Sequence, residues 1–133
     1  MYELTAREQN INALIGGEKF VLSYCECALW TEEVSILEEN ENADVNIFNI
    51  HPDSLAQMIA NCKSFKEQAG DLLEEWGDEQ GGHDLWLTRN GHGTGFWDRD
   101  LADKPTRDAL SKIAKDMGES DLYLGDDGKI YVT

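Results

Sequence analysis

The chain has 133 residues, of which 41% are hydrophobic and 29% are charged, and these values predict a single domain spanning residues 1–133. Its net charge of −16 argues against direct binding to nucleic acid or to an anionic membrane, because both require clustered lysine and arginine. No apolar run approaches the ~18 residues of a membrane span, and the N-terminus lacks the pattern of a secretory signal. We therefore expect a cytoplasmic protein.

The negative charge is concentrated in the first two thirds of the chain. The first 88 residues contain 18 acidic and 4 basic side chains, whereas residues 89–133 contain 9 acidic and 7 basic ones. No lysine or arginine occurs between Lys19 and Lys63, or between Lys66 and Arg89. A basic protein partner, a cation and simple solubility are all compatible with this distribution.

The three cysteines, Cys25, Cys27 and Cys62, argue against a disulfide framework because their number is odd. Cys25 and Cys27 lie in a mostly apolar run, where free cysteine behaves as a small hydrophobic residue. The three histidines do not complete a zinc-binding pattern with them. We therefore expect buried structural thiols and no metal site.

Two helices are expected near the N-terminus. Thr5-Ala6-Arg7-Glu8 fits a capping box, apolar residues follow at helical spacing, and Gly16-Gly17 ends the helix. The run from Phe20 to Trp30 is rich in β-forming residues, but its polar positions fall on one helical stripe: Lys19, Ser23, Glu26 and Glu33. This periodicity predicts a largely buried helix rather than a strand.

An acidic loop is expected from Glu38 to Asp44, before the clearest helix of the chain. Pro52 fits the first turn of that helix, and apolar residues repeat at helical steps from Leu55 to Trp76. Four carboxylates lie out of phase with the apolar stripe, so they should face away from the core: Glu67, Asp71, Glu74 and Asp78. These four are the candidate partner-binding residues.

The segment TRNGHGTGFWDRD, residues 88–100, has the composition of either a catalytic loop or a hairpin. Residues 77–82 read as a loop and residues 84–88 alternate as a strand. With Asn90-Gly91 as a two-residue type I′ turn, Leu85 would face Phe96 and Trp86 would face Gly95. The glycines would then leave room beside Trp86, so neither a phosphate nor a cofactor is needed to explain them.

The same pairing would place His83 opposite Asp98 and Arg89 opposite His92. A His–Asp pair could orient a general base, and Arg89 with Arg99 could hold an anion, but a charge pair at the rim of a sheet is the commoner meaning. The serines lie in no recognisable nucleophile elbow, and the glycines lack the context of a dinucleotide fingerprint. The four paired residues are therefore weak catalytic candidates, and no cofactor is expected.

A helix and a second hairpin are expected in the last third. The helix begins near Pro105 and ends at Gly118. In DLYLGDDGKIYVT, a two-residue turn at Asp127-Gly128 would pair Leu124 with Tyr131. Together the elements predict an α+β fold, in which a helical N-terminal half packs on a small antiparallel sheet. That sheet would consist of two hairpins, about residues 83–98 and 121–132, with a helix between them.

The segment GHDLWLTRNGHGTGFWDRD, with GDDGKIY near the C-terminus, resembles a family of small bacteriophage and prophage proteins. The shared signature of that family is approximately HDFWLTRNGHGAGFWDR, and Leu85 and Thr94 replace its Phe and Ala here. The likeness is specific over residues 82–99 and extends to residues 120–131. It implies a phage origin, and thus the cytoplasm of a bacterial host, but it implies no activity and no functional residues.

The first expected function is that of a non-enzymatic acidic phage protein that binds a host protein. The host protein could itself bind nucleic acid, and the chain would then act as a DNA mimic or counter-defence factor. Mimicry is compatible with the carboxylates because side chains on one helix stripe lie about 5–6 Å apart, near the spacing of phosphates along a DNA strand. The alternative is a small enzyme or ligand-binding protein with its site on residues 83–99. A third role, self-association, would place four tryptophans partly at an interface: Trp30, Trp76, Trp86 and Trp97.

Overall fold

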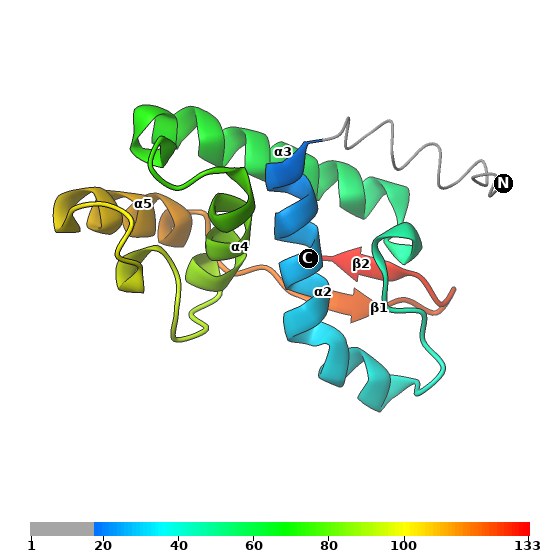
Figure 1. Cartoon of the computed structure of the whole chain (residues 1–133). Coiled ribbons are helices and arrows are strands. Elements are labelled where there is room, and N and C mark those ends of the chain that lie inside the picture. Colours follow the sequence, from blue (N-terminus) through cyan, green and yellow to red (C-terminus); the bar gives the residue numbers. More distant parts are fainter. Residues whose placement is uncertain (1–17) are drawn as a thin grey trace, which may run out of the picture.

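The computed structural model describes residues 18–133, so the helix expected from Thr5 to Gly16 lies outside the described residues. The described part is mostly helical, with one small antiparallel sheet, and is consistent with the predicted α+β class. Its elements are α2 (Lys19–Glu39), η1 (Ile47–Asn49), α3 (Pro52–Ala69), η2 (Gly70–Leu73), α4 (Asp78–Arg89), η3 (Phe96–Asp98), α5 (Lys104–Asp116), β1 (Leu122–Leu124) and β2 (Ile130–Val132). Figure 1 shows α2 in the middle, with α4 and α5 on one side of it and the two strands on the other.

The helix expected over Phe20 to Trp30 is present, and it continues as α2 to Glu39. Its contact with α4 is the most extensive between any two of the elements named above. Two glycines of α4 make this contact possible: a Cβ on Gly82 would overlap the carbonyl oxygen of Phe20 and lie 2.9 Å from the backbone nitrogen of Tyr24. Gly81 likewise faces the ring of Phe20. The backbones of α2 and α4 therefore touch where the two helices cross.

The hairpin expected over residues 83–98 is wrong. Residues 84–88 belong to α4, and Gly81-Gly82, expected in a loop, lie inside the same helix. Asn90-Gly91 ends α4 instead of turning a hairpin, since Gly91 has a φ of 65° and the Asn90 side chain donates to the carbonyl of Trp86 (3.0 Å). None of the predicted cross-strand pairs forms, because no strand is present in this segment.

The helix expected from Pro52 to Trp76 is present but ends at Ala69. Gly70, with a φ of 51°, breaks it, and η2 follows. Of the four candidate carboxylates, only Glu67 lies on α3; Asp71 is in η2, Glu74 follows η2, and Asp78 begins α4. The single straight stripe of carboxylates is therefore also wrong, although all four side chains are exposed.

The C-terminal strands pair antiparallel, in a register one residue away from the predicted one. Tyr123 faces Tyr131 and Leu124 faces Ile130. The loop has three residues rather than two, because Gly128, with a φ of 81°, adds a left-handed residue to a turn in which its N–H donates to the carbonyl of Gly125 (3.0 Å). A parallel bridge from Ile50 to Ile130 attaches the segment after η1 to the outer edge of β2.

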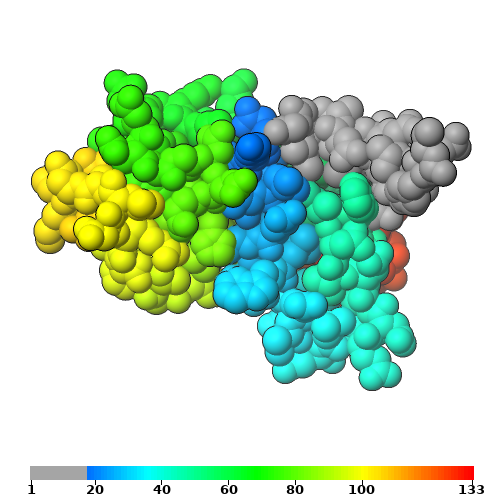
Figure 2. Space-filling model, in the orientation of Figure 1, coloured from blue at the N-terminus to red at the C-terminus, as the bar shows by residue number. Residues whose placement is uncertain are grey.

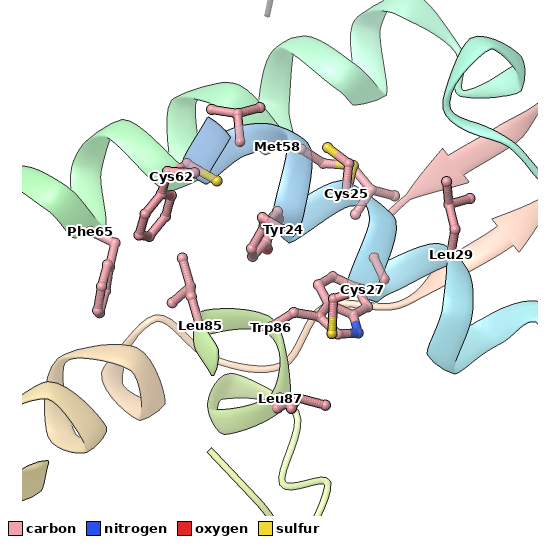
Figure 3. Packing of buried hydrophobic residues seen from close by; sticks show 14 of the residues in the cluster. Tyr24, Cys25, Cys27, Leu29, Met58, Cys62, Phe65, Leu85, Trp86 and Leu87 are labelled. Atoms are coloured by element: carbon pink, nitrogen blue, oxygen red, sulfur yellow. The ribbon is translucent and has the colours of Figure 1, made fainter. Parts of the chain in front are cut away.

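The core lies where α2, α3 and α4 meet, and Figure 3 shows Tyr24, Phe65 and Trp86 within it. The rings of Tyr24 and Trp86 meet edge to face with centroids 5.4 Å apart, and Phe65 stacks on Phe96 at the same distance. The helix expected near Pro105 is α5, which adds Leu110 and Ala114 to this core. None of the helices within residues 18–133 combines the length and the apolar character needed to cross a membrane.

The three thiols are free and buried, as predicted. Burial raises the pKa of Cys25 and Cys27 to about 12, and it also raises the pKa of Cys62. Their ordinary value is 9.0. The folded chain therefore keeps these protons at a pH at which the unfolded chain has lost them.

We expect the free energy of unfolding to fall as pH rises from 9 toward 12. Below pH 9 each thiol is protonated in both the folded and the unfolded chain, so its contribution to stability is complete. Above pH 9 deprotonation of the unfolded chain lowers the free energy of unfolding by up to about 1.4 kcal/mol per pH unit for each thiol. Urea unfolding at several alkaline pH values, with a reducing agent present, measures this slope. Cys27→Ala should make the slope shallower, and an unchanged slope in that variant would contradict the assignment.

Candidate functional site

Asp84 is the centre of a buried polar network on α4. Its carboxylate is fully buried and accepts from the indole of Trp76 (2.8 Å), the amide of Gln80 (2.9 Å) and the guanidinium of Arg99 (2.9 Å to Nη2). The hydrogen bond to Asp84 raises the pKa of Arg99 above its ordinary value. The network joins the loop before α4, the helix itself and the segment after η3, so its role is to hold these three parts together.

Arg89 is buried at the end of α4 and joins two helices. Its guanidinium donates to the Tyr24 hydroxyl (2.9 Å) and to the carbonyls of Gly118 (2.8 Å) and Met117 (3.3 Å) at the end of α5. Burial raises the pKa of the Tyr24 phenol, and Arg89 opposes part of that effect. Arg89 therefore caps α5 instead of facing His92.

Arg89→Lys should lower the free energy of unfolding by about 2 kcal/mol, because an ammonium group cannot reach all three acceptors from one position. Tyr24→Phe should cost about 1 kcal/mol, since it removes one of the three bonds and leaves a guanidinium nitrogen without its acceptor. Chemical denaturation measures both. Equal stability of Arg89→Lys and the unchanged protein would show that the carbonyls of α5 need no such cap.

The weak catalytic candidates lie in separate surroundings. His83 stacks on the indole of Trp30, with ring centroids 6.3 Å apart, while Asp98 accepts from the hydroxyl of Thr94 (2.9 and 3.0 Å). His92 is exposed in the loop after α4, and Arg89 points into the core. Neither the His83–Asp98 pair nor the Arg89–His92 pair is therefore present, and the hypothesis of a catalytic site depended on these pairs. Within residues 18–133, no group of three or more candidate ligand side chains is arranged to bind a metal ion.

One open depression is surrounded by three of the candidate partner-binding carboxylates. We call these three residues the acidic rim: Asp71, Glu74 and Asp78. The depression has a volume of about 750 Å³ and is also lined by Phe20 and Lys66. Among the residues that the structure describes, Lys66 is the only basic side chain in its lining, and its ammonium lies 3.2 Å from Glu18 and 3.9 Å from Asp78. Glu67 lies outside the rim, beside a second depression between α2 and α3.

A second surface feature is a pair of exposed apolar side chains on α2, which were not among the predicted partner-binding residues. Trp30 is 67% exposed and Val34 is 68% exposed, one helical turn apart. The sequence contains a signal for this exposure, because Trp30 falls on the polar helical stripe of Ser23, Glu26 and Glu33. A large aromatic residue on the solvent stripe of a helix is expected to stay exposed.

No protein-family model, no curated protein and no solved structure matches this chain.

Proposed function

We propose that this chain is a non-enzymatic binding protein that places its acidic rim against a basic surface of a host protein. The observation that carries the proposal is the convergence of Asp71, Glu74 and Asp78 around one depression. Within residues 18–133, Lys66 is the single cation of its lining, and it is already paired. Clustered carboxylates of this kind attract a partner of opposite charge and speed its association. The phage origin implied by the signature makes a bacterial protein the expected partner.

The shape of the rim favours one mode of recognition over another. The three carboxylates come from η2, the turn after it and the start of α4, so they enclose a hollow instead of following a straight helix. A lysine or arginine that projects from the partner could enter this hollow and meet carboxylates on several sides. A basic DNA-binding surface offers such side chains, so DNA mimicry or counter-defence remains part of the proposal. A lysine or arginine of the partner would insert into the hollow, and the carboxylates would not imitate one DNA strand.

Affinity capture from a bacterial host lysate tests the proposal with two matched variants. The rim variant is Asp71→Asn with Glu74→Gln and Asp78→Asn. The control variant removes the same three charges from exposed positions elsewhere, as Asp100→Asn with Glu119→Gln and Asp126→Asn. The unchanged protein and the control variant should retain one stoichiometric partner, and the rim variant or added salt should release it. Capture that ignores the rim variant, or that yields no partner, would refute the proposal.

A further inference from the structure

The exposed face of α2 carries an apolar anchor. Leu22, Trp30 and Val34 lie eight and then four residues apart along it, and they are 37%, 67% and 68% exposed. In the space-filling view, α2 (blue to cyan) runs down the surface between α4 and the segment that contains η1 (Figure 2). A tryptophan that is two thirds exposed leaves a large apolar area in water, and buried tryptophans are the commonest energetic anchors of protein interfaces.

The indole of Trp30 is held in place on one side and open on the other. His83 of α4 stacks against it at 6.3 Å, with the two ring planes inclined by only 28°. Beyond it lies a groove of about 310 Å³, whose apolar lining also includes Leu29, Val45 and Ile47. An apolar side chain from another molecule could therefore enter between Trp30 and the segment before η1 with little rearrangement of the site.

The charge of the groove decides which kind of molecule would occupy it. Glu26 and Glu33 line it and both are exposed, and no lysine or arginine is among the described residues of its lining. A second copy of this chain would bring these carboxylates against each other in a protein of net charge −16. A basic segment would instead pair with them while its apolar side chains contact Trp30.

We propose that the groove between α2 and η1 binds a basic amphipathic helix of a partner protein. The apolar face of that helix would lie on Trp30 and Ile47, and its lysines or arginines would pair with Glu26 and Glu33. The site is separate from the acidic rim, since ten residues of α2, or about 15 Å, separate Trp30 from Phe20 at the rim depression. The groove would therefore serve a binding function distinct from that of the acidic rim.

The test uses three synthetic peptides of about 14 residues, long enough for an amphipathic helix. One combines lysine and leucine in an amphipathic pattern, the second replaces each lysine by glutamate, and the third replaces each leucine by serine. Isothermal titration should show one-to-one binding of the lysine–leucine peptide only. Trp30→Ala should weaken it at least about tenfold, whereas Trp97→Ala, at another exposed tryptophan, should not.

Two further variants separate the groove from the rest of the acidic surface. Glu26→Gln with Glu33→Gln should weaken binding of the lysine–leucine peptide. The control variant, which lacks the charges of Asp100, Glu119 and Asp126, should leave the affinity of that peptide unchanged. Binding of the lysine–serine peptide with equal affinity, or binding indifferent to Trp30→Ala, would overturn the proposal. Self-association that Trp30→Ala abolishes, seen by sedimentation, would also overturn it, because the occupant would then be a second copy.

Discussion

Gly82→Ala should lower the free energy of unfolding by about 3 kcal/mol, although alanine normally stabilises a helix interior by about 1 kcal/mol relative to glycine. The added methyl group would overlap the carbonyl oxygen of Phe20 and crowd the backbone nitrogen of Tyr24. Neither atom can move without shifting α2, which supplies much of the core. Urea denaturation of the variant and of the unchanged protein measures the difference.

Gly81→Ala is the matched control for this prediction. Its methyl group would lie 2.8 Å from a ring carbon of Phe20, which is part of a side chain and can turn aside. We expect a loss below about 1.5 kcal/mol, because strain in the core is partly offset by the gain in helix propensity. If Gly82→Ala proved neutral or stabilising, the close crossing of α2 and α4 would be wrong.

Arg99→Met should cost about 3 kcal/mol, because it leaves the fully buried carboxylate of Asp84 without its cationic partner. Trp76 and Gln80 would still donate to it, which keeps the cost at the lower end of the range for a broken buried pair. Lys104→Met provides the control, since Lys104 and Asp108 form an exposed pair on α5 that is worth about 0.5 kcal/mol or less. Thermal and chemical unfolding measure both variants.

A double-mutant cycle shows whether the charge of Asp84 causes this loss. Asp84→Asn combined with Arg99→Met should cost clearly less than the sum of the two single changes, because a neutral amide needs no cation. Additive costs would mean that Arg99 acts through packing alone. In that case the network would not be held together by the ion pair.

The sequence predicted α2, α3 and α5 because each has a recognisable periodicity or cap, but it misassigned α4. Every side chain from Asp84 to Arg89 is buried, so this helix has no polar stripe within that segment that would reveal its period. Gly81-Gly82 and Asn90-Gly91 are strong local signals for loops and hairpins. Their actual causes are tertiary: Gly82 makes room for the backbone of α2, and Asn90-Gly91 ends the helix.

The sequence identified exposed carboxylates for the candidate site, but it did not predict how they are arranged in space. The four carboxylates are exposed as expected. Because α3 ends at Gly70, however, Asp71, Glu74 and Asp78 surround a depression instead of following one helix. A glycine within an otherwise continuous apolar pattern gives no measure of how sharply the chain bends there. The arrangement therefore depends on where α4 packs, which is the element that the sequence did not reveal.

The signature segment now has a structural explanation. Arg89 caps α5, Asn90 accepts from the backbone N–H of Ser120 (2.8 Å), Phe96 fills the core beside Phe65, and Arg99 neutralises Asp84. These residues join parts of the chain that are distant in sequence. Residues 82–99 thus serve mainly to pack the helices against one another, and apart from His83, which stacks on Trp30, the residues of the proposed binding surfaces lie outside this segment.

The affinity of the captured partner for the rim variant, measured against the control variant, tests the central claim most directly. Titrations at about 0.05 M and 0.3 M salt span a large change in screening length. The unchanged protein and the control variant should bind equally and should weaken together as salt is added. The rim variant should bind at least about tenfold more weakly at low salt and depend less on salt. Equal affinities of the rim and control variants would contradict the claim that Asp71, Glu74 and Asp78 form the binding surface.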